Sequence, residues 1–273
     1  MIEVNGVRLY VEITGTSDVP LVMVHGSWDS HHAWDLVVPR LAERFRVLTY
    51  DRRGHSRSER PVGQGSVHED VADLAALIEH LRLGPAWVVG SSFGASISLR
   101  LAAARPDVVR GVTGHEPPLF GLLGEDPLLR PLLDGVRRDV TAVAERIAAG
   151  DHAGAAEQFV DTVALGPGSW AQTPPEIQAQ LIENAPTFLD ESTDPDALVL
   201  DVGFLREFDK PILLTHGDQS PPPFAPVVTK LAQAGRRVEV RTLRGAGHVP
   251  HLTDPDAYVA TVLEFASRQE RFR

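Results

Sequence analysis

Short runs of apolar and β-branched residues recur in the first 116 residues and again after residue 206, and polar or amphipathic segments separate them. Runs this short and this apolar predict strands that are buried on both faces of a sheet. They occupy residues 21–24, 46–50, 86–89, 108–114, 211–217 and 238–243.

The amphipathic segments between these runs predict helices. From Ser66 to Leu83 the apolar residues recur at helical spacing, and Ser66 with Glu69 can form a capping box. Further helices are predicted at residues 34–45, 95–104, 226–234 and 254–267. Because strands and helices alternate, we expect an α/β fold with a mostly parallel central sheet and helices on both faces.

The first residues of the chain predict a hairpin. Asn5-Gly6 lies between two alternating segments, residues 2–4 and 7–13. A two-residue turn of type I′ needs positive φ at both positions, which Asn and Gly tolerate best. We therefore expect antiparallel strands before the parallel part of the sheet.

The strand pattern disappears between residues 117 and 205. This segment reads as helices separated by glycine and proline breaks, such as residues 166–168 and 174–175. We predict an α/β core made of residues 1–116 and 206–273, with residues 117–205 inserted as a helical lid.

Charge and cysteine content exclude several classes of function. The formal net charge of −11 disfavours nucleic acid and anionic membrane surfaces as partners. The absence of cysteine excludes disulfides, thiolate nucleophiles and Cys-ligated metal sites. No secretion signal or membrane-spanning run is visible, so we expect a cytoplasmic protein.

One pentapeptide, G-S-S-F-G at residues 90–94, points to chemistry. It joins the predicted strand at 86–89 to the predicted helix at 95–104. In that context the glycines allow a sharp turn that exposes the middle residue, Ser92, as a nucleophile. The alternative is an ordinary glycine-rich turn that binds phosphate at the helix N-terminus.

Several polar residues follow predicted strands and should meet Ser92 at one edge of the sheet. They are His25, Asp51, Glu116, Asp218 and His248. A serine nucleophile needs a base, which in turn needs a partner that fixes its tautomer. We choose His248 as the base because Gly245 to Gly247 precede it and Val249-Pro250 follow it; His251 and His216 are the alternatives.

The oxyanion formed during acyl transfer needs backbone donors. We expect the N–H groups of Phe93 and Ser27, the latter in the turn after the first buried strand. Trp28 could donate in place of Ser27.

Four motifs together resemble the α/β-hydrolase family over nearly the whole chain. They are H-G-S-W at 25–28, D-R-R-G-H-S at 51–56, G-S-S-F-G at 90–94 and G-A-G-H-V-P at 245–250. The resemblance implies a catalytic order of serine, acid and histidine, a helical cap, and no cofactor or metal.

The triad acid departs from the usual family pattern. The family commonly has an acid three residues after the glycine that ends the strand before last, but the residue at that distance from Gly217 is Ser220. His115-Glu116-Pro117 resembles the glutamate-bearing branch that includes zearalenone hydrolases. The resemblance therefore implies a Ser92–His248–Glu116 triad, with Asp218 as the runner-up acid.

The resemblance implies a serine hydrolase that cleaves a small apolar ester or lactone through an acyl-enzyme. Serine at position 92 disfavours dehalogenase and epoxide hydrolase chemistry, whose enzymes carry aspartate there. Zearalenone-type lactonase, perhydrolase and carbon–carbon hydrolase activities stay open, as does a non-enzymatic small-molecule receptor of the same fold. The candidate substrate-binding residues are Trp28, Phe120, Trp170 and Phe188.

Overall fold

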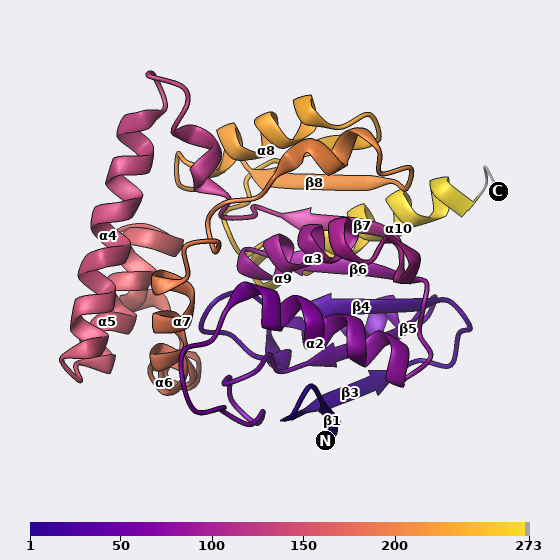
Figure 1. Ribbon diagram of the computed structural model, residues 1–273, viewed down its shortest axis with the longest axis horizontal. Helices are drawn as coiled ribbons and strands as arrows, with labels where there is room; N and C mark the ends of the chain where they lie inside the picture. Colours follow the sequence, from indigo (N-terminus) through magenta and orange to yellow (C-terminus); the bar gives the residue numbers. More distant parts are fainter. Residues whose placement is uncertain (271–273) are drawn as a thin grey trace.

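A seven-stranded sheet runs through the middle of the computed structural model, which describes residues 1–270 (Figure 1). The strand order is β3-β5-β4-β6-β7-β8-β9, and every neighbouring pair is parallel except β3 with β5. The strands are β3 (Val11–Thr14), β4 (Pro20–Val24), β5 (Arg46–Tyr50), β6 (Ala86–Ser91), β7 (Val109–His115), β8 (Ile212–Gly217) and β9 (Val238–Leu243). The predicted α/β fold with a mostly parallel sheet is confirmed.

Helices cover both faces of the sheet (Figure 1). One apolar core joins the sheet to α2, α3 and α8, and a second joins its other face to α1 and α10. These helices are α1 (Val38–Leu41), α2 (Val67–His80), α3 (Phe93–Ala104), α8 (Phe224–Ala234) and α10 (Pro255–Glu270). Burial on both faces explains why the strands are almost continuously apolar.

The predicted hairpin is present as β1 (Ile2–Val4) and β2 (Val7–Leu9), with Asn5 and Gly6 at φ of 48° and 75°. Its second arm does not continue to Ile13 as one strand. The chain leaves the hairpin at Tyr10, and β3 pairs instead with β5 of the main sheet.

The predicted helix over residues 34–45 is wrong in extent. The segment forms a 3₁₀ turn, His31–Trp34, and the single turn α1. Proline is tolerated only in the first turn of a helix, so Pro39 allows a helix to begin near Val38 but not to run through from Trp34.

Residues 117–205, which we call the lid, contain helices and no strand. The helices lie beyond the carboxyl ends of the strands, at the left of Figure 1. They are α4 (Arg130–Ala148), α5 (His152–Gln158), a π-helical turn (Phe159–Ala164), α6 (Pro175–Asn184) and α7 (Phe188–Thr193), and 3₁₀ turns span Phe120–Leu123, Trp170–Gln172, Ala185–Thr187 and Val202–Arg206. The boundaries that we gave to core and lid stay a prediction.

The lid has an apolar cluster of its own. Val143, Ile147, Phe159 and Phe188 pack together in it, and Trp28 reaches into it from the core. Trp28 stacks on Phe159 with ring centroids 4.7 Å apart. The lid is therefore held to the core by buried aromatic contact.

Short turns complete the described structure. They are 3₁₀ Pro106–Val108, between α3 and β7, and α9 (Pro250–Thr253), directly after the loop that carries His248. Within residues 1–270, no helix has the length and apolar character needed to cross a bilayer.

Candidate active site

Ser92 lies between β6 and α3 in a strained backbone conformation. Its φ is 52° and its ψ is −123°, outside the regions that a serine ordinarily adopts. The Ser92 carbonyl already accepts hydrogen bonds from the amides of Ala95 and Ser96, so the helix begins directly at this turn. This is the geometry that exposes a nucleophile at the top of a sheet.

Glycine is required on both sides of Ser92. A Cβ at Gly90 would lie 2.4 Å from the Gly94 carbonyl oxygen, and a Cβ at Gly94 would lie 2.1 Å from the Val24 carbonyl oxygen. Both contacts are with backbone, which cannot swing away. The two glycines of the motif therefore let α3 pack against the ends of β4 and β6.

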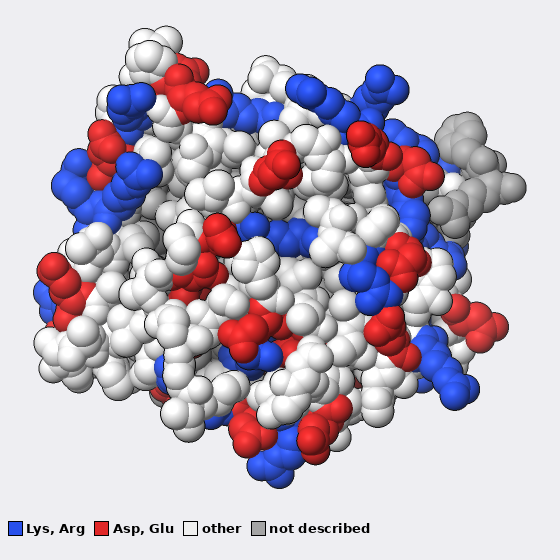
Figure 2. Space-filling model, in the orientation of Figure 1, with Lys and Arg blue, Asp and Glu red and all other residues white. Residues whose placement is uncertain are grey.

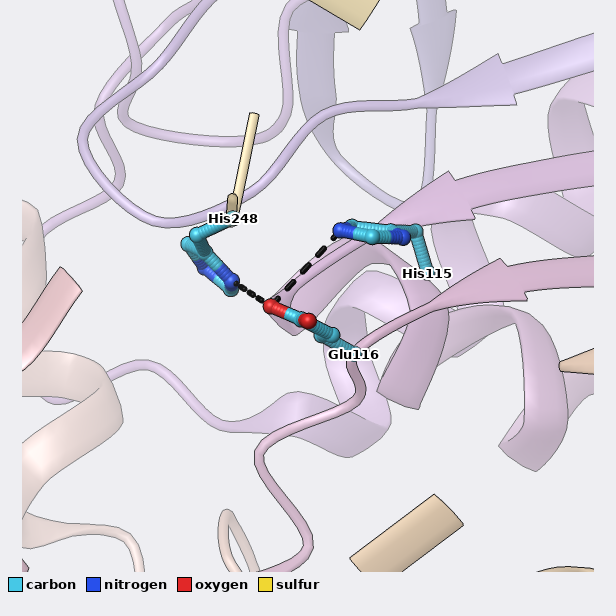
Figure 3. A group of neighbouring side chains, drawn as sticks. All are labelled: His115, Glu116 and His248. Atoms are coloured by element: carbon cyan, nitrogen blue, oxygen red, sulfur yellow. Dashed lines mark hydrogen bonds and ion pairs between the residues drawn. The ribbon is translucent and has the colours of Figure 1, made fainter. Parts of the chain in front are cut away.

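Glu116 and His248 form the polar pair expected beside Ser92. The Nδ1–H group of His248 donates to Oε2 of Glu116 at 2.6 Å (Figure 3). This bond fixes the tautomer of His248 and leaves Nε2 as the nitrogen that can accept a proton. The imidazole is 6% exposed and stacks on Phe224, with ring centroids 4.4 Å apart.

Glu116 is held as a carboxylate inside the protein. Burial alone would raise its pKa, but the hydrogen bond and charge of His248, the nearby His115 and the Ser220 hydroxyl lower the pKa to about 2. Its Oε1 also accepts the backbone N–H of Gly217 at 2.8 Å. Thus Ser220, at the family's usual acid position, lies beside the carboxylate instead of supplying it.

His115 is a further buried group at this pair. Its Nε2 lies 3.6 Å from Oε2 of Glu116, and its Nδ1 is 2.9 Å from the Thr215 hydroxyl (Figure 3). Burial lowers the pKa of His115 to about 4, so the ring is neutral at pH 7.

His115, Glu116 and His248 offer ligand atoms within 4.8 Å of one another, a spacing that a metal ion could use. However, Nδ1 of His248 and Oε2 of Glu116 are only 2.6 Å apart. A zinc ion between a nitrogen and an oxygen ligand holds each at about 2.0–2.2 Å, which separates those two atoms by more than this. The contact is that of a hydrogen-bonded acid and base.

Ser92 and His248 line the same cavity, whose volume is about 380 Å³. Ser27 and Phe93, the expected oxyanion donors, also line it. Gly26 runs directly past the nucleophile, since a Cβ there would lie 3.1 Å from Cβ of Ser92. The cavity thus brings together Ser92, His248, Ser27 and Phe93, and Glu116 is joined to them through its hydrogen bond with His248.

A family model described as alpha/beta hydrolase fold matches residues 19–255. The chain belongs to the α/β-hydrolase fold family. The order of its elements, with the lid inserted between β7 and β8, agrees with this membership.

Several proteins that are similar to this α/β-hydrolase are described as esterases or lactonases. A pimeloyl-[acyl-carrier protein] methyl ester esterase of Sodalis glossinidius is 29% identical over 268 residues, covering 95% of this chain and 98% of that protein. A solved structure described as "Est816 as an N-Acyl homoserine lactone degrading enzyme" covers 97% of this chain and 99% of its own, with a TM-score of 0.76 and 23% identity. The enol-lactonase from Burkholderia xenovorans LB400 has a TM-score of 0.76 at 20% identity, covering 97% of this chain and 98% of its own.

The alternative acid and bases lie elsewhere in this α/β-hydrolase. Asp218 is exposed, and its Oδ1 accepts the backbone N–H of Gly245 at 2.8 Å, so it supports the loop before His248. His216 has its Nε2 3.0 Å from the Thr242 hydroxyl. His251 is buried against Trp34, with ring centroids 4.7 Å apart.

The four candidate substrate-binding residues divide into two pairs. Phe120 and Phe188 line the cavity. Trp28 is fully buried within the lid cluster, and Trp170 packs against the same cluster. Neither is among the residues that line the cavity. Aromatic residues at lid positions were ambiguous in the sequence because the packing of the lid on itself uses the same residue types.

The structure adds cavity residues that the sequence patterns did not single out. Phe224 stacks on His248, and Glu191 of α7 is an acidic residue in a cavity lining that is otherwise mostly apolar. Arg52, beside the cavity, belongs to the D-R-R-G-H-S motif, but its ionic partners are far away in the chain. Only the motif itself could have pointed to Arg52, and no local signal marked Glu191.

Proposed function

We propose that this α/β-hydrolase is a serine hydrolase that cleaves a carboxylic ester or lactone through an acyl-enzyme. The observation that carries the proposal is the 2.6 Å hydrogen bond between His248 and the buried Glu116, at a cavity that Ser92 also lines. A nucleophile, a base and an acid that orients the base are the three parts of such a triad.

In the proposed first half-reaction, Oγ of Ser92 attacks the substrate carbonyl carbon and its proton passes to Nε2 of His248. Glu116 stabilises the resulting imidazolium through Nδ1–H. The negative charge on the carbonyl oxygen is met by the backbone N–H groups of Ser27 and Phe93. His248 then gives its proton to the leaving alkoxide, and the acyl group stays on Ser92.

In the second half-reaction, His248 takes a proton from water, and the hydroxide oxygen attacks the acyl carbon. The bond to Ser92 breaks, Ser92 regains its proton from His248, and a carboxylic acid leaves. With a lactone, the alcohol and the acid belong to one product, which has the mass of the substrate plus one water.

We infer a small, largely apolar acyl group as the part that the cavity holds. Phe120, Leu133, Val163 and Phe188 are among its lining residues. Its volume of about 380 Å³ is within the range of small-molecule sites, roughly 300–1,000 Å³. The relatives described as ester and lactone hydrolases support this substrate class.

The proposal is tested with a panel of short-chain and medium-chain aryl esters, an N-acyl homoserine lactone and a macrocyclic lactone, with Ser92→Ala as the control. We expect at least one substrate to take up one water with multiple turnovers in the wild type and none in Ser92→Ala. Turnover of the macrocyclic lactone well above the esters would select the zearalenone-type activity. Tight binding without turnover across the panel would contradict the proposal.

A further inference from the structure

The peptide between Gly26 and Ser27, which we call the oxyanion peptide, is fixed through its carbonyl oxygen. Nη1 of Arg52 donates to the Gly26 carbonyl at 3.2 Å. His25 Nδ1 is 2.8 Å from the same oxygen, and its Nε2 accepts the Arg52 backbone N–H at 2.9 Å. Nε2 of His25 is thus an acceptor and Nδ1–H a donor, so two donors hold one carbonyl.

Fixing this carbonyl also fixes the expected oxyanion donor. In a trans peptide the C=O and N–H groups point in opposite directions. The Ser27 N–H is therefore directed away from Arg52 and His25. A small rotation of the oxyanion peptide would turn that N–H away from the position of the developing negative charge.

Glu191 connects this peptide to the lid. It belongs to α7, a lid helix labelled in Figure 1. Only 8% of Glu191 is exposed. Its Oε1 accepts from Nη1 of Arg52 at 3.0 Å, and its Oε2 accepts the Ser27 hydroxyl at 2.5 Å. Glu191 thus holds both the side chain of Ser27 and the guanidinium that holds the Gly26 carbonyl.

The core completes the environment of Arg52. The carboxylate of Asp70 accepts two hydrogen bonds from the guanidinium of Arg52, from Nε to Oδ1 at 3.1 Å and from Nη2 to Oδ2 at 2.9 Å. The guanidinium lies over the ring of Phe93, 4.8 Å from its centroid. Arg52 therefore contacts Phe93, which carries one expected oxyanion donor, and the carbonyl of the peptide whose N–H group is the other.

Attachment of the lid to the core does not by itself explain why the carboxylate of Glu191 is buried against Ser27 and Arg52. Other lid residues already bind the core: Asp190 accepts the Gly65 N–H, Asp194 accepts the Val67 N–H, and Asn184 donates to the Trp28 carbonyl. Burying an ionic network is costly and is often no more stabilising than apolar packing. The position of Glu191 on Ser27 and Arg52 calls for a function beyond attachment.

We propose that Glu191 and Arg52 are positioning residues for the oxyanion hole, with Glu191 making the geometry of the Ser27 N–H dependent on the docked lid. This rests on the proposed serine hydrolase function. Glu191 acts through Ser27 and Arg52, and a substrate that reaches Ser92 before the lid docks meets an incompletely fixed donor.

The test compares Glu191→Ala, Glu191→Gln and the matched control Asp190→Ala in the full chain, using the best ester from the panel. Asp190 precedes Glu191 in α7 and also binds the core, but it contacts Gly65 and not the oxyanion peptide. We expect Glu191→Ala to lower kcat roughly 30-fold to 100-fold, below the loss of a whole donor, with KM changed less than about threefold. Glu191→Gln, which keeps the shape and an acceptor, should recover most of kcat, and Asp190→Ala should keep the wild-type value.

An alkyl boronic acid supplies the second readout, because its tetrahedral adduct on Ser92 places an oxygen in the oxyanion hole. Its inhibition constant should weaken in Glu191→Ala by the same factor as kcat/KM falls. A kcat within about twofold of wild type, or a loss carried wholly by KM, would overturn the inference. If Glu191→Ala does not fold, Glu191→Leu decides, because leucine fills much of the same space but offers no acceptor to Ser27 or Arg52. Boronate binding weakened at least about threefold supports the inference, and unchanged binding overturns it.

The two proposals fail in different ways. If no ester or lactone is hydrolysed in a Ser92-dependent manner, the proposed function is wrong. If hydrolysis depends on Ser92 but Glu191→Ala has the wild-type kcat, only the role of Glu191 is wrong.

Discussion

Glu116 and Asp218 both follow strands at the carboxyl edge of the sheet, but only Glu116 contacts His248. The backbone of Glu116 has a φ of 49°, an uncommon value for a residue with a long side chain. In that conformation, the carboxylate of Glu116 accepts hydrogen bonds from both the Gly217 N–H and His248. We read this strained residue as the triad acid.

Glu116→Gln should therefore impair catalysis far more than Asp218→Asn. An amide at position 116 cannot stabilise the imidazolium or hold the correct tautomer of His248, so kcat should fall roughly 10³-fold to 10⁴-fold, as in serine proteases. Asp218→Asn keeps an acceptor for the Gly245 N–H and should leave kcat within about threefold of wild type. Steady-state kinetics of the two variants checks this, and the opposite ranking would make Asp218 the acid.

At the residue scale, the sequence could indicate Ser92, His248 and Ser27 because each lies in a short motif whose meaning is local. Choosing Glu116 needed the family resemblance, since its partner is 132 positions away. The role of Glu191 could not be predicted from the sequence for the same reason. Its partner Ser27 is 164 positions away, and no motif surrounds Glu191 in the chain.

At the scale of elements, the turn between β6 and α3 depends on close backbone packing. A Cβ on Gly94 would meet the carbonyl oxygens of Val24 and His25 at 2.1 and 2.5 Å. Gly135, within α4 of the lid, has open space around it, since only the Arg138 side chain comes within 4 Å. The same substitution should therefore have opposite effects at the two positions.

Gly94→Ala should destabilise the protein by about 1–3 kcal/mol or more and lower activity, because α3 or β4 must move. Gly135→Ala should be neutral or stabilising by up to about 1 kcal/mol, since alanine is the better helix former. Urea unfolding of both variants measures the difference. Equal stability of the two would show that the contact at Gly94 is not tight.

Strands were the elements most readily predicted, because the buried runs are apolar on both faces and bounded by polar turns. The helix expected over residues 34–45 failed at Pro39. Within the lid, the sequence predicted helices but not which aromatic side chains face the cavity. That division depends on how α4 to α7 pack together, and no periodicity within a single helix contains this information.

At the scale of the whole molecule, acidic and basic side chains are interspersed on the face shown in Figure 2, with no broad basic field. The net charge of −11 is therefore not opposed there by a basic surface suited to nucleic acid. This agrees with an apolar small molecule as the proposed substrate.

The buried histidines make stability depend on pH. Burial lowers the pKa of His25 and His55 well below the usual range, that of His115 to about 4 and that of His251 to about 3. When the pH falls below 6.5, the pKa of histidine in the unfolded chain, these residues bind protons in the unfolded state but stay neutral in the folded state. Their contribution to stability is complete above pH 6.5 and is lost as pH falls toward the folded-state values.

Burial also raises the pKa of Asp29 to about 6 and that of Glu191 above its usual value. These two carboxyl groups bind a proton more readily in the folded state, so their effect on stability becomes more favourable as pH falls, opposite to that of the histidines. A single variant separates the two contributions. His251→Phe keeps a ring against Trp34 and removes one titrating group.

Between pH 6.5 and 5, the wild type should lose about 1.6 kcal/mol more unfolding free energy than His251→Phe, because the unfolded histidine is half protonated at pH 6.5 and the loss approaches about 1.4 kcal/mol per pH unit only below that. Urea unfolding at the two pH values measures this difference. Parallel losses in the two proteins would show that His251 titrates normally in the folded state.

A fluorophosphonate tests whether Ser92 is a nucleophile activated by His248 and Glu116, without knowledge of the natural substrate. Phosphonylation joins Oγ of Ser92 to phosphorus, releases fluoride and passes the serine proton to His248. Intact mass and peptide mapping should show one adduct, located on Ser92, in the wild type. They should show none in Ser92→Ala and much slower formation in Glu116→Gln. An adduct on another residue, or equal labelling of Ser92→Ala, would contradict the account.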